Sequence, residues 1–386
     1  MTRLIKRYRS MWVLLVMTMV FGGASLAVDV YLAAKPFMKY MPDGQVVPMW
    51  GFATANADFS IVGPASSPGP MITVPDTDGT LTIHLKNLLT ADPVSITLAG
   101  QAPPTSVTVD AAPVPVAPVR HVGGDFDGRV RSFLPETPVG SVGVYNFENV
   151  RPGSYIYHSA THIAVQMQMG LYGAMKKDFA PFTAYSGVTY NDEVIMFYSE
   201  VDPALHLAVH YGYYGTPDYP NTLNYDPRYY LINGDPYNVI LEPALATGTP
   251  GDQVLIRFFN AGLRDHIPVL EGEYMDLVAE DGNKLPYPRI QYSVLMTAGK
   301  TMDAIFVRPG GGPFPIYDRV ALPMAAPQAD LNQDGLVDAT DLTIMINFIN
   351  GHLTIFSEYA QYHADMNHDG EVNQSDLNIL SILMAG

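Results

Sequence analysis

Cysteine is absent from the sequence. The chain therefore has no disulfide framework, and its stability must come from core packing and from bound ions. Thiolate ligands and thiolate nucleophiles are excluded as well. Catalysis that depends on a cysteine sulfur is thus ruled out from composition alone.

Basic residues are scarce and unevenly placed. The chain of 386 residues has 21 Lys and Arg against 38 Asp and Glu, a formal net charge of −17. Four of the basic residues lie within the first nine positions, and without them 17 remain against 38. A surface this acidic repels nucleic acid and anionic lipid and favours solubility and the binding of cations. We therefore expect no nucleic-acid partner.

Long apolar runs are also missing beyond the N-terminus. The run Met11–Phe21 follows the basic cluster and precedes the small-residue site Ser25-Leu26-Ala27. This order is typical of a secretory signal peptide, here residues 1–27 with cleavage after Ala27. The alternative, a transmembrane anchor, is disfavoured because the run is short for a bilayer. We expect a secreted protein, extracellular or attached to the cell surface, without membrane contact after cleavage.

Apolar residues and turn formers are abundant. Apolar residues make up 48% of the chain, aromatic residues 11%, and Gly and Pro number 33 and 32. This mixture predicts a mainly β protein with many turns. Residues 102–143, rich in Pro and Val, are expected to run over the surface. Hydrophobic patterns predict strands at 79–89, 92–101 and 193–202. The pair Asp202-Pro203 is a helix cap and predicts a short helix at 204–212.

Two acidic loops near the C-terminus match each other position by position. They read DLNQDGLVDATD (330–341) and DMNHDGEVNQSD (365–376), each with a glycine at position six, where the chain must turn sharply. Oxygen side chains at positions one, three, five and twelve, with a backbone carbonyl at seven, are the arrangement that Ca²⁺ requires. The predicted calcium ligands are Asp330, Asn332, Asp334, Leu336 and Asp341 in the first loop and Asp365, Asn367, Asp369, Glu371 and Asp376 in the second.

One apolar helix follows each loop, LTIMINFING after the first and LNILSILMAG after the second. Position twelve is Asp in place of the bidentate Glu of sensor EF-hands. Both features resemble the duplicated half-EF-hands of type I dockerins over residues 328–386. The resemblance implies a small α-helical domain with two EF-hand-like calcium sites, whose folding depends on the metal. It also implies a cohesin-like partner protein.

The rest of the chain resembles copper oxidases. The segments GTLTIHLKN, VSITLAGQ, RPGSYIYHSATH, GLYGAM, YLINGDPY, VLIRFFNAG and LVAEDG occur in the order found in multicopper oxidases and copper nitrite reductases. The resemblance implies two plastocyanin-like cupredoxin domains, each a Greek-key β-sandwich, at residues 28–188 and 189–325. The excursion at 102–143 would belong to the first domain, and the dockerin would follow the second.

The residues that would bind copper are largely replaced. Multicopper oxidases have two histidines flanking one residue on a strand of the first domain, and Thr97 and Ala99 occupy those positions here. Neither side chain can replace a neutral imidazole on copper. In the second domain, HIPVLEGEYM (266–275) follows the pattern of a histidine-rich copper strand but keeps only His266.

The segment YHSATH (157–162) aligns with copper motifs in two ways. As the multicopper His-x-His motif, it keeps both histidines with two residues inserted between them. As the blue-copper motif Tyr-His-Cys-Ala-Thr, it has Ser159 at the thiolate position, Gln166 at a histidine position and Leu171 at the axial methionine. A serine hydroxyl does not ionise near neutral pH and forms no Cu–S bond. Both alignments imply that an electron-transfer copper is absent.

The remaining histidines leave an alternative open. His158 and His162 are four residues apart, as are His206 and His210, and the second pair would share one face of the expected helix. With His266, they are the candidate ligands of a residual transition-metal centre. The competing interpretation is that these imidazoles are half-buried and hydrogen-bonded to the backbone.

The sequence therefore predicts a secreted, non-catalytic scaffold protein that binds Ca²⁺, lacks copper and attaches to a cohesin-like partner. Assembly of copies of the chain through the dockerin stays open. The alternative is a copper-binding oxidoreductase that uses the residual histidines. Three ring nitrogens within about 4–5 Å of one point would support it, since metal–nitrogen bonds are near 2 Å.

Overall fold

The computed structural model describes residues 28–43, 45–123, 126–216, 221–236, 248–310, 314–319, 331, 337, 339–352, 364–365 and 371–385. The signal peptide expected at residues 1–27 lies outside this part of the chain. Six of the predicted calcium ligands also lie outside it, namely Asp330, Asn332, Asp334, Leu336, Asn367 and Asp369. Among the described residues, no helix has the length and apolar character needed to cross a bilayer.

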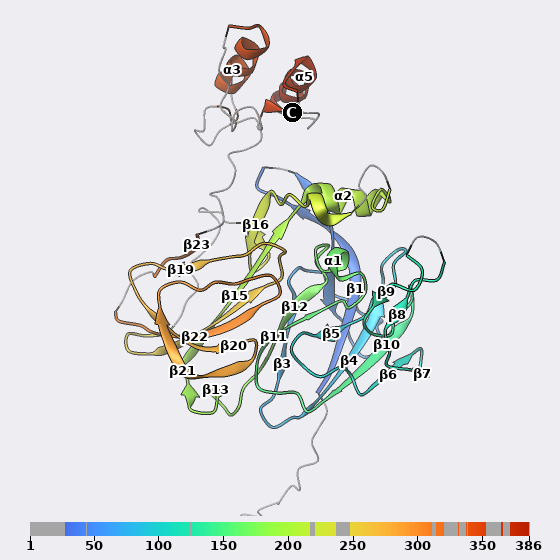
Figure 1. The fold of residues 1–386 in the computed structure, drawn as a ribbon, viewed down its shortest axis with the longest axis vertical. Coiled ribbons are helices and arrows are strands. Elements are labelled where there is room, and N and C mark those ends of the chain that lie inside the picture. Colours follow the sequence, from blue (N-terminus) through green and yellow to red (C-terminus); the bar gives the residue numbers. More distant parts are fainter. Residues whose placement is uncertain are drawn as a thin grey trace, which may run out of the picture.

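Residues 28–177, which we name the N-terminal β unit, form a sandwich of two sheets (Figure 1). Its main strands are β1 (Val28–Tyr40), β2 (Val46–Thr54), β3 (Gly69–Val74), β4 (Thr80–Asn87), β5 (Thr97–Leu98), β6 (Ser106–Val109), β7 (Ala112–Val114), β10 (Val142–Glu148), β11 (Gly153–His158) and β12 (Tyr172–Lys177). One sheet has the order β2-β1-β4-β10-β6-β7 and the other has the order β3-β12-β11-β5. Within these sheets β1 is parallel to β4 and β12 is parallel to β3, whereas the other pairs are antiparallel.

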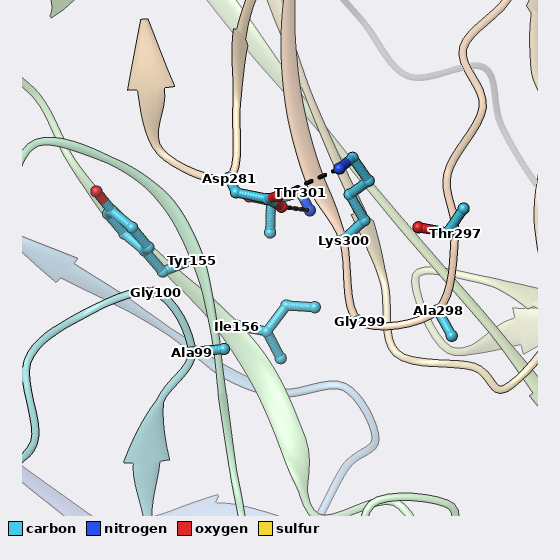
Figure 2. A pocket seen from close by; sticks show the side chains of 10 residues that line it. All are labelled: Ala99, Gly100, Tyr155, Ile156, Asp281, Thr297, Ala298, Gly299, Lys300 and Thr301. Carbon is cyan, nitrogen blue, oxygen red and sulfur yellow. Dashed lines mark hydrogen bonds and ion pairs between the residues drawn. The ribbon is translucent and has the colours of Figure 1, made fainter.

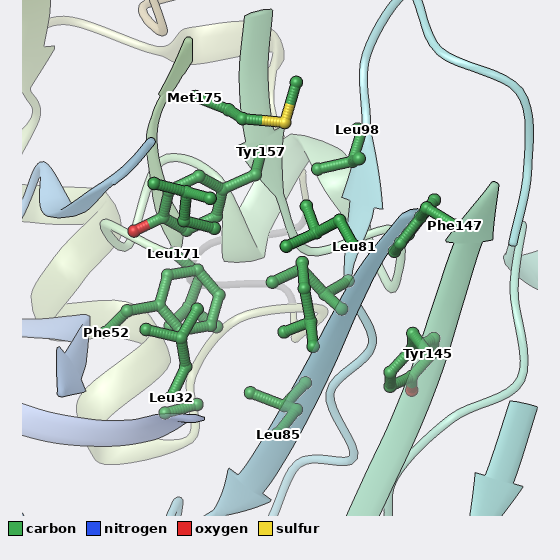
Figure 3. Packing of buried hydrophobic residues seen from close by; sticks show 14 of the residues in the cluster. Leu32, Phe52, Leu81, Leu85, Leu98, Tyr145, Phe147, Tyr157, Leu171 and Met175 are labelled. Carbon is green, nitrogen blue, oxygen red and sulfur yellow. The ribbon is translucent and has the colours of Figure 1, made fainter. Parts of the chain in front are cut away.

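Apolar side chains from both sheets meet between them (Figure 3). Leu81, Ile83 and Leu85 of β4 all enter this core, because alternate side chains of a strand face the same side. Their spacing is the pattern that predicted the strand. Across the sandwich, the rings of Phe52 and Tyr157 lie 5.5 Å apart between centroids. Burial of this apolar surface is the main force that stabilises the unit.

Residues 192–318, the C-terminal β unit, are organised around one large sheet. Its strands are β15 (Asp192–Val201), β16 (Tyr229–Ile232), β17 (Asp235–Pro236), β18 (Gln253–Asn260), β20 (Met275–Glu280), β21 (Asn283–Gln291) and β22 (Thr301–Val307), in the order β17-β16-β15-β18-β22-β20-β21. A second sheet pairs β19 (Pro268–Leu270) with β23 (Ile316–Asp318). The core of the unit includes side chains from both sheets, among them Phe258 and Leu270.

Shorter elements lie within the two units and in the segment between them. They are β8 (Val119–Arg120), β9 (Val130–Ser132), α1 (Ile163–Gln166), β13 (Thr183–Tyr185), β14 (Val188–Thr189), α2 (Pro203–Tyr211) and the 3-10 helix η1 (Thr222–Asn224). Helix α2 confirms the helix predicted from the cap, because the Asp202 carboxylate accepts a hydrogen bond from the Ala204 backbone N–H at 2.9 Å.

The two β units share an apolar seam. Tyr172 of β12 stacks on Phe197 of β15, and Phe197 stacks on Phe259 of β18, with ring centroids 5.2 Å apart in both pairs. Ile156 and Ala174 belong to the same buried cluster. The units therefore lie side by side, as Figure 1 shows, and the face of β11 and β12 that points away from the core of the N-terminal β unit packs against the C-terminal β unit.

Two stretches of the N-terminal β unit differ from the sequence prediction. Only β5 is a strand within 92–101, because the backbone of Val94 exchanges both of its hydrogen bonds with Thr137, in a loop. The surface excursion expected at 102–143 contributes β6 to the six-stranded sheet, and Val107 of β6 is buried. The surrounding prolines hid the period-2 alternation of this strand.

Two helices follow the acidic loops, where the sequence predicted them. They are α3 (Ala339–Ile349) and α5 (Gln374–Ala385), drawn in red in Figure 1 away from the β units. Met345 of α3 and Leu380 of α5 are fully buried in one small cluster with Leu331 and Ala364. This cluster is small, which is consistent with a domain that needs bound metal to hold its loops.

Candidate functional site

The serine at the thiolate position lies directly after β11 and is completely buried. The Ser159 hydroxyl donates a hydrogen bond of 2.6 Å to Oε1 of Gln166, which is on α1. The Gln166 amide nitrogen in turn donates to the backbone carbonyl of Pro93 at 2.9 Å. The fold thus brings into contact the two side chains that the blue-copper alignment placed at ligand positions, and their polar atoms satisfy one another.

A cluster of hydroxyl groups adjoins this pair. Ser95 Oγ lies 3.0 Å from Thr161 Oγ1 and 3.2 Å from Ser132 Oγ, and all three residues are completely buried. On the other side, the backbone N–H of Ser159 donates to the carbonyl of Leu171 at 3.0 Å. The hydroxyl cluster could not be predicted from the sequence, because its members come from three distant segments that no spacing connects.

These residues do not fit copper. A blue-copper centre needs a thiolate and imidazoles, whereas the atoms that face each other here are a hydroxyl, an amide and a backbone carbonyl. The Ser159 proton is engaged by Gln166, and the side chain at the axial position, Leu171, has no donor atom. The side chains at the blue-copper position therefore support no reaction step that uses a copper ion.

Ser159→Ala tests how much this hydrogen-bonded pair stabilises the fold. We expect a loss of about 1–3 kcal/mol in the free energy of unfolding, because the substitution leaves Gln166 Oε1 buried without a donor. The matched control is Ser106→Ala at an exposed position of β6, which should stay within about 0.5 kcal/mol. Urea unfolding of both variants gives the comparison, and equal losses would contradict a specific role for the pair.

The histidines of YHSATH have different environments. His158 is buried, and its Nδ1 donates to the Ser159 carbonyl at 2.8 Å, which leaves the lone pair on Nε2. Burial lowers the pKa of His158, so the ring is neutral. His162 is exposed, and its ring centroid lies 5.4 Å from that of His121, a residue of the excursion that the sequence analysis did not single out.

The histidine pair of α2 is divided between core and surface. The His206 ring is buried, and its Nδ1 donates to the Pro48 carbonyl at 2.8 Å. Burial lowers the pKa of His206 to about 4. His210 is exposed in the last turn, with its ring 4.9 Å from that of Tyr211. His206 therefore has the backbone-bonded environment that the competing interpretation describes.

His266 lies between two buried carboxylates. Its Nε2 is 3.0 Å from Glu200 Oε2, and its Nδ1 is hydrogen-bonded to Asp318. Burial alone would lower the pKa of His266, but the hydrogen bonds and charges of Asp318 and Glu200 outweigh it and raise the pKa to about 9. The ring is therefore a cation at neutral pH, with a proton on each nitrogen and no lone pair for a metal.

The five candidate histidines do not form one metal centre in this arrangement. Within the ranges that the structure describes, no group of three or more His, Cys, Asp or Glu side chains is arranged to hold a metal ion.

A buried ion cluster links the two β units and was also missed from sequence. The Arg257 guanidinium of β18 is fully buried and donates to Asp178 at 2.5 Å and to Glu193 at 3.0 Å. It also donates to the Ser154 hydroxyl of β11 at 3.1 Å. That hydroxyl donates to Asp303 of β22 at 2.6 Å, and Asp303 accepts a second hydrogen bond from Tyr185. Burial raises the pKa of Asp303, whereas Arg257 opposes that shift.

A cleft of about 310 Å³ opens between the two units and includes Ala99 (Figure 2). Its only titratable side chains are those of Tyr155, Asp281 and Lys300. Lys300 is paired with Asp281 at 3.2 Å, and Tyr155 donates to the Pro152 carbonyl at 2.9 Å. The lining residues are Ala99, Gly100, Tyr155, Ile156, Asp281, Thr297, Ala298, Gly299, Lys300 and Thr301. The lining thus contains Ala99, at one of the two positions where the resemblance to multicopper oxidases implies a histidine.

Four of the predicted calcium ligands lie in the described part of the C-terminal region. Asp341 and Asp376, at position twelve of each loop, are fully buried. Asp341 accepts a hydrogen bond from the Leu331 backbone N–H at 2.6 Å, and Asp376 accepts one from Asn373 at 2.9 Å. Each carboxylate thus ties its helix to its loop. The other two are Asp365 and Glu371.

Comparison with known proteins agrees with both resemblances. Residues 328–382 match the dockerin type I domain. No curated protein matches the chain in sequence. Among solved structures, a blue copper oxidase from Nitrosomonas europaea aligns at 18% identity with a TM-score of 0.56, over 76% of this chain and 80% of its own. The multicopper oxidase mgLAC aligns at 23% identity with a TM-score of 0.55, over the same shares of the two chains.

A copper nitrite reductase from Nitrosomonas europaea aligns at 20% identity with a TM-score of 0.52, over 76% of this chain and 89% of its own. At these identities the likeness concerns the fold. The chain thus combines two cupredoxin-like β-sandwich domains with a C-terminal dockerin type I domain.

Proposed function

We propose that this protein is a secreted, non-catalytic scaffold. Its cupredoxin-like part is a binding module that has lost the copper sites of its structural relatives. Its dockerin binds two Ca²⁺ ions and attaches the module to a cohesin-like protein. Cleavage after Ala27 belongs to this proposal, and the N-terminal sequence of protein recovered from the culture medium tests it.

The dockerin match at residues 328–382 is the observation that carries the proposed attachment. The hydrogen bonds of Asp341 and Asp376 support it, because in each loop the last carboxylate already holds a loop backbone N–H. Carboxylate oxygens at the last position of such a loop are the ligands that Ca²⁺ prefers. The strongly acidic composition of the chain also favours cation binding.

The Ser159–Gln166 hydrogen bond supports the absence of catalysis. Both side chains are buried and paired with each other, so neither a redox metal nor a nucleophile is available at the blue-copper position. The cleft between the units offers no alternative, since its lysine is held by a carboxylate.

Binding to a panel of cohesins tests the attachment. Full-length protein is expected to bind one of them in calcium, to lose binding and C-terminal helicity on chelation, and to recover both when calcium is restored. The double variant Asp341→Ala/Asp376→Ala should not bind, whereas Asp235→Ala, an exposed aspartate of the C-terminal β unit, should bind normally. Calorimetry and circular dichroism give the two readouts. Binding and helicity that survive chelation would overturn the proposal.

An oxidase assay tests the non-catalytic part separately. Copper-loaded protein is expected to oxidise neither a phenol nor a metal ion, because among the described residues no group of three or more His, Cys, Asp or Glu side chains is arranged to hold a metal ion. Turnover of either substrate that is abolished by His158→Asn would instead establish the residual copper centre of the alternative.

A further inference from the structure

Two surface histidines meet outside the blue-copper position. His121 and His162 have ring centroids 5.4 Å apart, and the ring planes are inclined by 72°. Backbone hydrogen bonds fix both positions. The N–H of His162 donates to the Arg131 carbonyl at 2.9 Å, and the N–H of His121 donates to the Arg129 carbonyl at 2.9 Å. The proximity of the rings is therefore held by the β8–β9 hairpin.

His162 has a backbone conformation that is uncommon for a residue other than glycine. Its φ is 41° and its ψ is 54°, in the left-handed region. Such a conformation in a residue other than glycine costs free energy of order 1–3 kcal/mol and is concentrated at functional sites. His162 precedes α1 but makes no side-chain capping bond, so helix capping does not explain the residue.

The electrostatics keep the His162 ring available to a cation. Although the residue is exposed, partial desolvation of its ring lowers the pKa of His162, and the charges of His121 and Arg131 lower it further, so the imidazole is neutral near pH 7. The Asp92 and Glu136 carboxylates lie close enough to act on it in the opposite direction. Glu136 is paired with Arg131, with Oε1 3.1 Å from Nε, and Asp92 is half-buried beside His162. A metal ion here would thus sit near a carboxylate.

The separation of the ring centroids agrees with two imidazoles on one ion. Nitrogen ligands at 2.0–2.1 Å in a tetrahedral shell place the two ring centroids about 5 Å apart. We propose that His121 and His162 bind one divalent transition-metal ion such as Zn²⁺ at the surface of the N-terminal β unit. Asp92 adds negative charge, and water fills the remaining positions. This site is separate from the calcium loops and does not depend on the proposed attachment.

Zinc binding to the full-length protein tests this site. In saturating calcium, which keeps the dockerin loops filled, calorimetry with Zn²⁺ is expected to show one additional site. His121→Asn and His162→Asn should each weaken Zn²⁺ binding at this site. The loss of affinity should exceed the about 10–100-fold that removing an outer-shell partner of a metal site costs. Asparagine suits position 162 because it tolerates the left-handed conformation. The matched control is His210→Asn, another exposed histidine, which should bind Zn²⁺ as the unmodified protein does.

The outcomes separate the proposal from its competitors. Loss of Zn²⁺ binding in both variants, with unchanged thermal stability in the absence of zinc, supports the pair. No binding by the unmodified protein overturns it. Binding that persists in both variants also overturns it, and binding lost with Asp341→Ala assigns the zinc to the dockerin loops.

Discussion

Replacing Arg257 by methionine is expected to lower the free energy of unfolding by about 3–5 kcal/mol, the cost of removing one partner of a buried ion pair. The guanidinium is fully buried and holds Asp178 and Glu193. Methionine fills similar volume but removes the guanidinium from Asp178 and from Asp303 behind it, while Glu193 keeps its ion pair with Lys176. Because the cluster joins β11 of one unit to β18 and β22 of the other, the loss should appear in the unfolding of both units.

The control for this prediction is Arg289→Met. Arg289 pairs with Glu280 at 3.0 Å, but its side chain is 54% exposed, so the loss should be at most about 1 kcal/mol. A double-mutant cycle with Asp303→Asn adds a second check. Neutralising Asp303 should recover part of the Arg257→Met loss, because burial already disfavours this carboxylate. Strictly additive losses would show that the two groups do not interact.

His266→Leu is expected to cost a similar amount, about 3–5 kcal/mol near pH 7. The substitution removes the cation that lies between the buried carboxylates of Glu200 and Asp318. Asp318 keeps the hydrogen bond from the Ile267 backbone N–H at 2.8 Å. Glu200 keeps hydrogen bonds from the Leu263 and Arg264 backbones, at 2.6 and 2.8 Å, which should moderate the loss. Denaturant unfolding measures it.

The pH dependence distinguishes this role from simple packing. The pKa of His266 is about 9 in the folded protein, above its ordinary 6.5, so the folded state binds the proton more tightly. Its contribution of about 3 kcal/mol is complete below pH 6.5 and is lost as pH rises through 9. His206 acts in the opposite direction. Its folded pKa of about 4 means that stability is lost as pH falls from 6.5 towards 4.

Unfolding midpoints across this pH range check the assignment. The unmodified protein should be most stable near neutral pH and lose stability on the alkaline side, and His266→Leu should lack that alkaline loss. His84→Gln is the control, since His84 pairs with Asp29 at 2.8 Å in a more exposed setting. An alkaline decline that persists unchanged in His266→Leu would falsify the assignment.

Several features could be predicted from the sequence because their signals are local. The alternation in β4, the Asp202 cap of α2 and the helices after the acidic loops all depend on residues close together in the chain. Period-2 and capping patterns need only neighbouring residues. Two local predictions were wrong. Prolines concealed the pattern of β6, and the apolar run at 92–101 did not indicate that most of it pairs with a loop and forms no strand beyond β5.

By itself, the sequence determined that no thiolate exists in this protein and that two oxygen-rich loops lie near its C-terminus, and it predicted that Ser159 and Gln166 stand at the ligand positions of the blue-copper alignment. Only the tertiary structure decided how these side chains behave. Ser159 and Gln166 satisfy each other, His266 becomes a cation between carboxylates, and His162 meets His121 instead of His158. The reason is physical: the protonation and partners of a side chain depend on neighbours that folding brings from distant segments, and no spacing along the chain encodes them.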